Sequence, residues 1–115
     1  KIEYEQTLRN RYLQGGRGLF LHYYQQQRVG LSNAYITEED KVKTLNIAEF
    51  YVEPSSRGKG IASQMKNQLI AWGRKQGATQ LKIEVDKGLK TANRFWFKFF
   101  TLDPSGLRNV YSANI

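Results

Sequence analysis

A strand, a glycine-rich turn and a long helix, in that order, constrain the fold of this 115-residue chain more than any other feature. Residues 42–52, VKTLNIAEFYV, predict a long strand, and Pro54 ends its pattern. RGKG at 57–60 then opens a stretch, 59–76, in which apolar residues recur at helical spacing. Residues 81–86, LKIEVD, alternate strictly as a second strand. This strand–helix–strand unit predicts two parallel strands joined by a right-handed crossover.

The segments around this unit predict strands of opposite direction and two further helices. Before it, we expect a helix over 2–14, where Tyr4, Leu8 and Tyr12 share one helical face, and a hairpin of strands at 19–24 and 29–36. After it, we expect an aromatic-rich helix at 90–100, a turn at 103–106 and a last strand at 107–113. The prediction is therefore an α/β fold with a mixed sheet, formed by residues 1–115 as one domain.

The composition excludes several kinds of site. The chain has no cysteine, which rules out disulfides, thiolate nucleophiles and cysteine-ligated metals. Its single histidine, His22, makes a dedicated zinc site unexpected, and its place in an aromatic strand favours a structural role. Because we find neither a long apolar run nor an apolar N-terminal segment, we expect no membrane span, no signal peptide and a cytoplasmic location.

The formal net charge of +8 favours an anionic partner. Phosphorylated cofactors and nucleic acids both fit this charge. The basic residues are scattered along the chain, however, so a solvated basic surface explains them equally well.

The turn at 57–60 has the features of a phosphate site. A helix N-terminus presents unpaired N–H groups and partial positive charge, so it stabilises an anion. Gly58 and Gly60 let the backbone approach a phosphate closely, and Arg57 and Lys59 add positive charge. The segment lacks the glycine spacing of the dinucleotide-binding and Walker A motifs, which disfavours a dehydrogenase or a nucleotide triphosphatase. A glycine-rich helix start without any ligand is the alternative.

The segment FYVEPSSRGKGIASQM resembles the central motif of the GCN5-related N-acetyltransferase (GNAT) family, in which R/Q-x-x-G-x-G/A follows a strand and opens a long helix. RGKGIA at 57–62 matches all its fixed positions. The hairpin at 19–36 is similar to the second and third strands of the family, LKIEVD to its fifth, and ANRFWFKFF to the helix that follows. The resemblance covers most of residues 15–100 and implies the acyl-CoA N-acyltransferase fold.

The resemblance also implies a cofactor, acetyl-CoA. The backbone amides of residues 58–63 would hold its pyrophosphate, and the strand end at Tyr51 and Val52 would pair with its pantetheine arm where two parallel strands splay apart. The residues implied in cofactor binding are Tyr51, Val52, Arg57, Gly58, Lys59, Gly60, Ile61, Ala62, Ser63 and Trp96. No metal is implied.

Three positions of the late helix depart from the family pattern. Trp96 stands where many members place the tyrosine that protonates the leaving thiolate, and an indole cannot serve as that acid at neutral pH. Trp96 is therefore expected either to pack on the cofactor or to fill the core. Leu89 and Phe100 replace a common asparagine and glycine. The first strand and helix of the family are missing or cut away, which predicts an N-terminally truncated domain.

Glu49 is the candidate general base. Alternation along 42–52 assigns Ala48, Phe50 and Val52 to one face of the strand and Ile47, Glu49 and Tyr51 to the other. This places the Glu49 carboxylate near the splay point, where it could take a proton from an amine. A strand carboxylate paired with a lysine or arginine is the alternative reading of Glu49.

Three functions follow as hypotheses. The first is an N-acetyltransferase that transfers the acetyl group of acetyl-CoA to an amine of a small molecule or peptide, and a homodimer is compatible with it. The second is a catalytically degenerate module that binds coenzyme A or serves in interactions, as Trp96 and Leu89 suggest. The third is a basic domain directed to nucleic acid or tRNA, which a steep salt dependence of binding would reveal.

Overall fold

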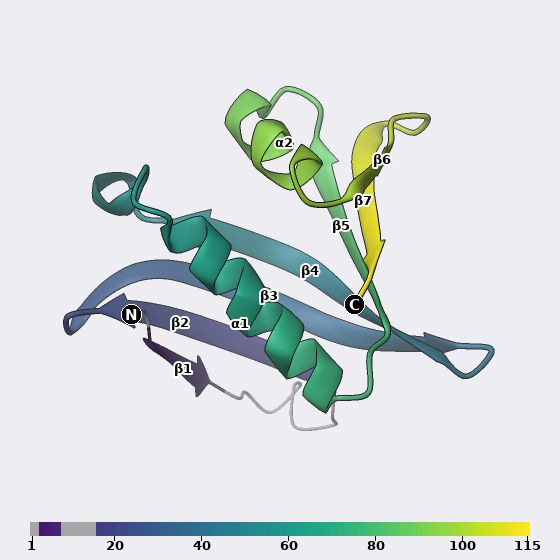
Figure 1. Ribbon diagram of the computed structural model, residues 1–115, viewed down its shortest axis with the longest axis horizontal. Coiled ribbons are helices and arrows are strands. Elements are labelled where there is room, and N and C mark those ends of the chain that lie inside the picture. The colour runs from purple at the N-terminus through teal and green to yellow at the C-terminus, as the bar shows by residue number, and fades with distance from the viewer. Residues whose placement is uncertain (1–2, 8–15) are drawn as a thin grey trace.

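A computed structural model describes residues 3–7 and 16–115. The described residues form one mixed sheet of seven strands, in the order β1-β2-β3-β4-β5-β7-β6, with two α-helices (Figure 1). The strands are β1 Glu3–Thr7, β2 Arg17–Tyr24, β3 Gln27–Glu39, β4 Val42–Val52, β5 Gln80–Asp86, β6 Thr101–Asp103 and β7 Arg108–Asn114. The helices are α1 Ile61–Lys75 and α2 Lys90–Phe97, and a short 3-10 turn, η2 Pro54–Ser56, precedes α1. The α/β class and the mixed sheet are confirmed, and β6 is an addition to the predicted elements.

The helix expected over residues 2–14 is wrong at residues 3–7. These residues form β1, which pairs antiparallel with β2, and the rest of the predicted helix lies outside the described residues. The spacing of Tyr4, Leu8 and Tyr12 in the sequence fits one helical face. The edge of β2, however, offers unpaired backbone groups that a neighbouring strand can satisfy. Pairing with the sheet thus overrides the local periodicity, and the strand expected to be missing ahead of the hairpin is present.

A β-bulge at Ala48 changes the faces of β4. Asn33 of β3 lies opposite Glu49, whereas the next residue of β3, Ala34, lies opposite Ile47, which leaves Ala48 without a partner. Ile47 is therefore buried on the helix side, and beyond the bulge Phe50 packs on that same side. The prediction that Ile47 shares a face with Glu49 is wrong, because the extra residue shifts the alternation by one.

Both helices cover the same face of the sheet. Trp72 of α1 meets Phe20 of β2 edge-on, with ring centroids 5.2 Å apart. Trp96 of α2 meets Phe50 of β4 in the same way at 4.9 Å, and Phe50 also packs against the cluster that contains Met65 of α1. These contacts build the core between the sheet and the helices. No described helix is long and apolar enough to cross a membrane.

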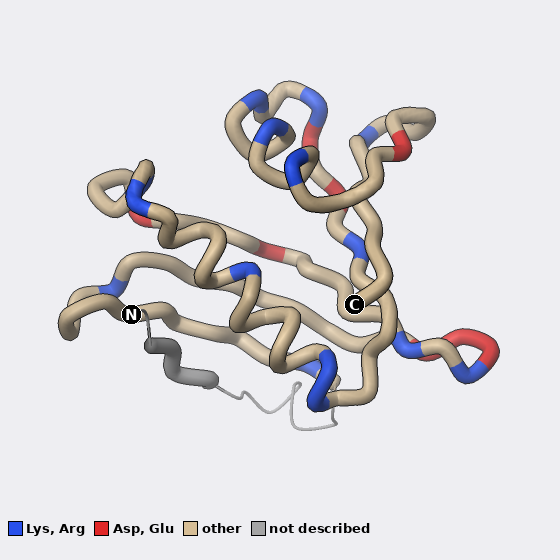
Figure 2. The backbone as a smooth tube through the Cα atoms, in the orientation of Figure 1, with Lys and Arg blue, Asp and Glu red and all other residues tan. Residues whose placement is uncertain are grey.

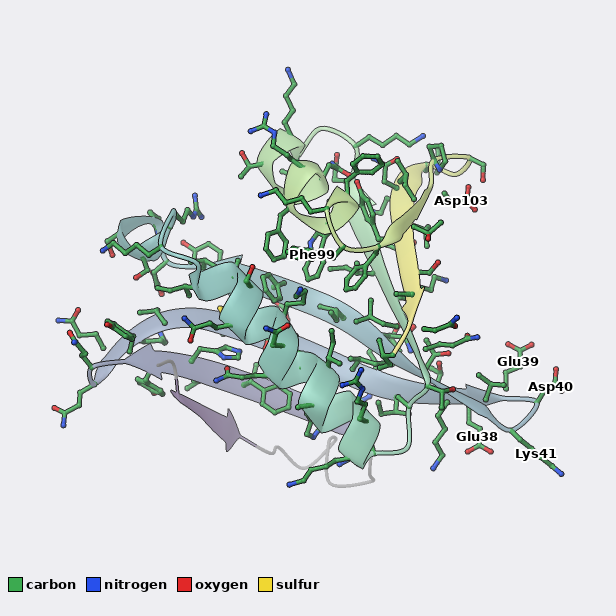
Figure 3. The ribbon with its side chains drawn as sticks, viewed as in Figure 1. Glu38, Glu39, Asp40, Lys41, Phe99 and Asp103 are labelled. Atoms are coloured by element: carbon green, nitrogen blue, oxygen red, sulfur yellow. The ribbon has the colours of Figure 1, made fainter. Side chains whose placement is uncertain are left out.

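Lys66 of α1 is a basic residue that is buried between the two helices. Its side chain is only 8% exposed, and its Nζ lies 3.3 Å from the ring centroid of Phe99, which follows α2. Phe99 projects from the end of α2 toward α1 (Figure 3). Burial lowers the pKa of the Lys66 ammonium. This cation–π contact joins the two helices and explains why a charged residue lies inside.

The pairing between β4 and β5 ends partway along the two strands. Their parallel pairing runs from Thr44–Gln80 to Ile47–Ile83 and goes no further. Beyond Ile83, β5 continues to pair with β7, while β4 follows β3. Figure 1 shows the two halves of the sheet diverging from this point, with the start of α1 on one side of the gap and α2 on the other.

Candidate functional site

The turn ahead of α1 depends on glycine for its backbone torsions. Gly58 and Gly60 have φ angles of 78° and 75°, a region that other residues rarely adopt. A Cβ atom at either position would meet nothing within 4 Å, so space is not the constraint. The two glycines therefore allow the backbone to turn into the helix, and they leave the outer side of the turn open.

The start of α1 is suited to an anion. Gly60 is its N-cap and provides no side-chain hydrogen bond, and no acidic residue lies in the first turn. The amides of the first helical residues, from Ile61 to Ser63, consequently have no intrahelical acceptor. Arg57 is held nearby, because its Nε donates to the Val52 carbonyl oxygen at 3.0 Å and its guanidinium lies 5.6 Å from the centre of the Tyr51 ring.

A cleft of about 910 Å³ separates the start of α1 from α2. It brings together most of the predicted cofactor residues, namely Tyr51, Val52, Arg57, Gly58, Gly60, Ile61, Ala62, Ser63 and Trp96. Lys59 is the exception and lines a neighbouring cavity instead.

The charge of this cleft is wholly positive among the described residues. Its lining includes the cations Arg57, Lys90, Arg94 and Lys98 and no carboxylate. Figure 2 shows basic residues gathered on α2 and at the turn ahead of α1. A site of this composition favours a phosphorylated ligand.

Trp96 both fills the core and lines the cleft. It is 2% exposed, meets Phe50 edge-on and stacks on Phe100 at 5.6 Å. The described residues thus confirm core packing for this side chain, and the part of it that reaches the cleft is aromatic surface without a hydroxyl group.

Glu49 lies outside this cleft, on the opposite face of the sheet. It is two residues beyond Ile47, where the pairing of β4 with β5 ends, and its side chain is exposed. Asn33 of β3 donates a hydrogen bond from Nδ2 to Glu49 Oε1 at 3.1 Å. The other amide atom, Asn33 Oδ1, is buried and has no hydrogen-bond partner in the part of the chain that the structure describes. Glu49 is thus next to the gap between the strands, with a neutral amide as its hydrogen-bond partner.

Sequence reasoning missed two asparagines. One is Asn33, and the other is Asn93 of α2, whose Nδ2 donates to the carbonyl oxygens of Asp86 and Leu89. Asn93 Oδ1 accepts hydrogen bonds from the Tyr111 hydroxyl at 2.7 Å and from the Asn109 amide at 2.8 Å. Asn93 therefore fixes the start of α2 against β5 and β7. Its one signal in the sequence is a residue of low helix propensity inside a helical stretch.

His22 lies in the core beneath α1, away from the cleft. It is fully buried, its Nδ1 donates to Gln68 Oε1 at 2.8 Å, and its Nε2 accepts from the Ser32 hydroxyl at 2.8 Å. Burial lowers the pKa of its imidazole. Among the described residues, no group of three or more His, Asp and Glu side chains is placed to hold a metal ion.

A family comparison gives the class of protein to which this fold and cleft belong. The model of the acetyltransferase (GNAT) family matches residues 1–100, and the chain belongs to this family. No curated protein matches the chain.

Solved structures share the fold at low sequence identity. A GNAT family acetyltransferase from Elizabethkingia anophelis, solved with acetyl-CoA bound, has a TM-score of 0.78 and 14% identity, with coverage of 99% of this chain and 98% of that one. Arabidopsis thaliana Naa50, in complex with the bisubstrate analogue CoA-Ac-MVNAL, has a TM-score of 0.77 and 17% identity, with 99% of both chains covered. The PaiA N-acetyltransferase of Thermoplasma acidophilum, in complex with coenzyme A, has a TM-score of 0.77 and 12% identity over 90% of this chain and 64% of that one.

Proposed function

We propose that the protein transfers the acetyl group of acetyl-CoA to an amine of a small molecule or peptide. The observation that carries this proposal is the end of the β4–β5 pairing at Ile47–Ile83. On the helix side of the gap lies the cleft with the anion-binding turn, and on the other side lies Glu49. A thioester and an amine can therefore meet in the gap while each is held from its own side of the sheet.

The residues of the cleft fit coenzyme A. Its pyrophosphate would lie on the amides of residues 58–63, with Arg57 and Lys59 beside them. Among the described residues, β4 has no strand partner on its β5 side beyond Ile47, although the Val52 carbonyl oxygen accepts a hydrogen bond from Arg57 Nε. The amide-bearing pantetheine arm could therefore add beside this part of β4 as an extra strand.

The chemistry asked of the protein is modest, because a thioester already carries an activated acyl group. Glu49 would accept the proton that the amine loses as its nitrogen bonds to the acyl carbon. The C–S bond then breaks with its electron pair on sulfur, and solvent protonates the thiolate. Trp96 cannot supply that proton at neutral pH.

A module that binds coenzyme A without transfer is the second candidate. It is favoured by Trp96, an indole at the position where the resemblance to the family implies a tyrosine.

One assay separates the two candidates. We expect thiol release from acetyl-CoA with a panel of amines and peptides, and we expect Glu49→Gln to lower kcat by about 100-fold, the lower range for general-base catalysis. Glu84→Gln, at an exposed position of β5, is the matched control and should leave kcat unchanged. Cofactor binding without any thiol release would leave the binding module as the function, and the absence of both would reject each candidate.

A further inference from the structure

The face of the sheet that carries Glu49 is apolar on its β2–β3 side. Phe20 of β2 and Ala34 of β3 are buried in the core that includes α1, and half-buried residues such as Leu21 and Leu31 alternate with them and face the other way. Both helices lie across the sheet from this second face, so no described helix covers it (Figure 1). The open face of an antiparallel sheet is ordinarily polar. Leucines there indicate an interaction surface.

The strand register places an apolar row directly beside Glu49. Leu21 lies opposite Leu31, and Leu31 lies opposite Tyr51, which is 44% exposed. We call these three residues the Leu31 row. Because opposite residues lie about 5 Å apart, the row extends about 10 Å across three strands. It is two residues along each strand from the pair Asn33–Glu49, hence on the same face and about 7 Å from that pair.

The Glu49 carboxylate is complementary to an ammonium group. It accepts a hydrogen bond from the neutral amide of Asn33, and it forms no ion pair within the part of the chain that the structure describes. On the β5 side of the gap, the outward residues Lys82 and Glu84 are exposed and charged. An amine whose nitrogen lies at Glu49 therefore finds apolar surface in one direction, toward β3.

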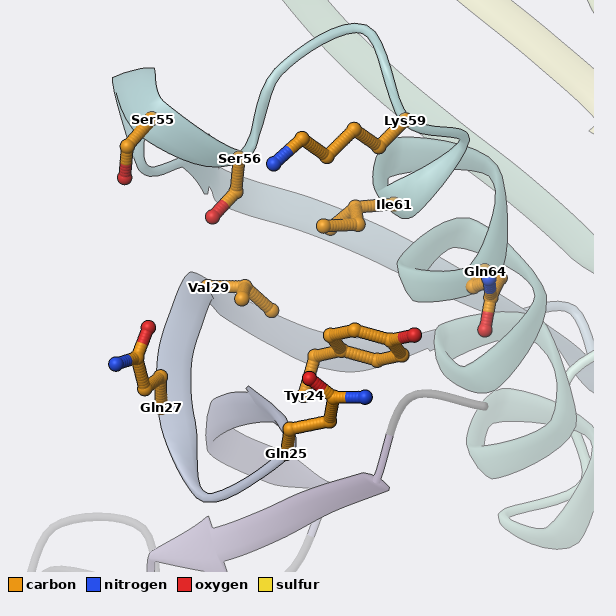
Figure 4. Close-up of a pocket in the computed structure, with 9 residues that line it drawn as sticks. All are labelled: Tyr24, Gln25, Gln27, Val29, Ser55, Ser56, Lys59, Ile61 and Gln64. Carbon is orange, nitrogen blue, oxygen red and sulfur yellow. The ribbon is translucent and has the colours of Figure 1, made fainter.

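The charge around the gap disfavours a second ammonium on the same molecule. The cleft on the helix side is lined by cations and by no carboxylate, and Lys59 lies in the cavity next to it (Figure 4). The whole chain carries a formal net charge of +8. A polycation is repelled by such a field, whereas one ammonium can be neutralised by Glu49 alone.

We propose that the acetyl acceptor is a primary amine with one apolar substituent, whose nitrogen lies at Glu49 and whose substituent lies on the Leu31 row. The proposal rests on the proposed function, because it takes the face that carries Glu49 as the acceptor side of the gap. Two sources share this chemistry, namely a small aryl or alkyl amine and the amino end of a peptide whose first residue is apolar.

Thiol release at saturating acetyl-CoA tests this acceptor class. We expect kcat/KM to be about tenfold higher for 2-phenylethylamine than for 1,5-diaminopentane, the lower range for apolar discrimination. Leu31→Thr keeps a β-branched strand residue and should raise the KM for 2-phenylethylamine about tenfold. It should leave the KM for acetyl-CoA and the kcat/KM for 1,5-diaminopentane unchanged.

Val42→Thr is the matched control. Val42 is 38% exposed and starts β4, seven residues before Glu49, so its change should leave every kinetic constant as it is. Equal melting temperatures of the two variants would show that the fold is intact. A preference for 1,5-diaminopentane would overturn the proposal, and so would equal KM values for 2-phenylethylamine in the two variants. Loss of a dimer in Leu31→Thr without a change in KM would also overturn it, because the row would then be an interface between copies.

A tetrapeptide that begins with phenylalanine identifies the source of the amine. A kcat/KM above that of 2-phenylethylamine assigns the row to peptides, and a lower value assigns it to small amines. Calorimetry of 2-phenylethylamine with the protein saturated by coenzyme A separates this proposal from the proposed function. Binding that Leu31→Thr weakens, together with no thiol release from acetyl-CoA for any amine, would contradict the proposed transfer alone.

Discussion

Asn33 and Glu49 are joined across β3 and β4 by a hydrogen bond of 3.1 Å from Nδ2 to Oε1, directly beside the β-bulge at Ala48. The bond engages Oε1 of the Glu49 carboxylate and fixes the orientation of an otherwise exposed side chain. The bulge makes this pairing, because without the extra residue a different side chain of β4 would lie opposite Asn33.

Asn33→Ala is expected to lower kcat through Glu49. Loss of the amide frees the carboxylate to rotate, which we expect to reduce kcat by about tenfold with little change in KM for acetyl-CoA. Steady-state kinetics checks this, and in a Glu49→Gln background the Asn33 change should have no further effect. Asn46→Ala, which removes a similar amide on the same strand pair, is the control. Additive losses in the double variant would contradict a role through Glu49.

Gly60→Ala is expected to destabilise the fold and weaken cofactor binding. The φ angle of 75° costs about 1–2 kcal/mol for a residue with a Cβ, although the surrounding space is free. Urea unfolding measures the stability loss, and calorimetry with coenzyme A measures the affinity. Gly106→Ala, whose Cβ would meet its nearest atom at 3.7 Å and which has no positive φ, should be neutral. Equal stability of both variants would show that the turn tolerates other torsions.

His22 is expected to make stability fall as the solution becomes acidic. Burial lowers its pKa in the folded protein below the ordinary value of 6.5, so the unfolded chain binds a proton at a higher pH than the folded one. The contribution of neutral His22 to the free energy of unfolding is therefore complete above about pH 6.5 and declines below it. The free energy of unfolding then falls with a limiting slope of about 1.4 kcal/mol per pH unit. Unfolding in urea at several pH values between 5 and 8 checks this. Because the chain has one histidine, His22→Gln should remove the decline above pH 5.

Asn93→Ala is expected to cost about 1–3 kcal/mol in unfolding free energy, because it removes the Oδ1 acceptor of the buried Tyr111 hydroxyl and leaves that hydroxyl only the backbone carbonyl oxygen of residue 93, at 3.2 Å. Tyr111 is 1% exposed, and burial raises the pKa of its phenol. Thermal or urea unfolding measures the change. Asn114→Ala, at an exposed position of β7, is the control. A loss no larger than that of the control would mean that Asn93 does not anchor α2.

The sequence predicted the elements that depend on local pattern. The bounds of β4 are those expected, and α1 and β5 agree within about two residues, because alternation, helical spacing and glycine are read directly from neighbouring residues. The glycine turn ahead of α1 could be placed for the same reason.

The features that depend on pairing across the sheet could not be predicted. The bulge at Ala48 follows from the register of β3 against β4, and β1 follows from an open edge on β2. The burial of Lys66 likewise requires Phe99, which is distant in sequence. The contact between Asn33 and Glu49 depends on that same register, so the amino-acid sequence alone did not indicate it.

The parting of β4 from β5 has a kinetic consequence. The acetyl-CoA donor and the amine acceptor would reach the gap from opposite faces of the sheet. Neither would therefore have to leave before the other binds. The chain has no cysteine to carry an acyl group between two half-reactions. A ternary complex is therefore expected, with double-reciprocal plots that intersect rather than run parallel.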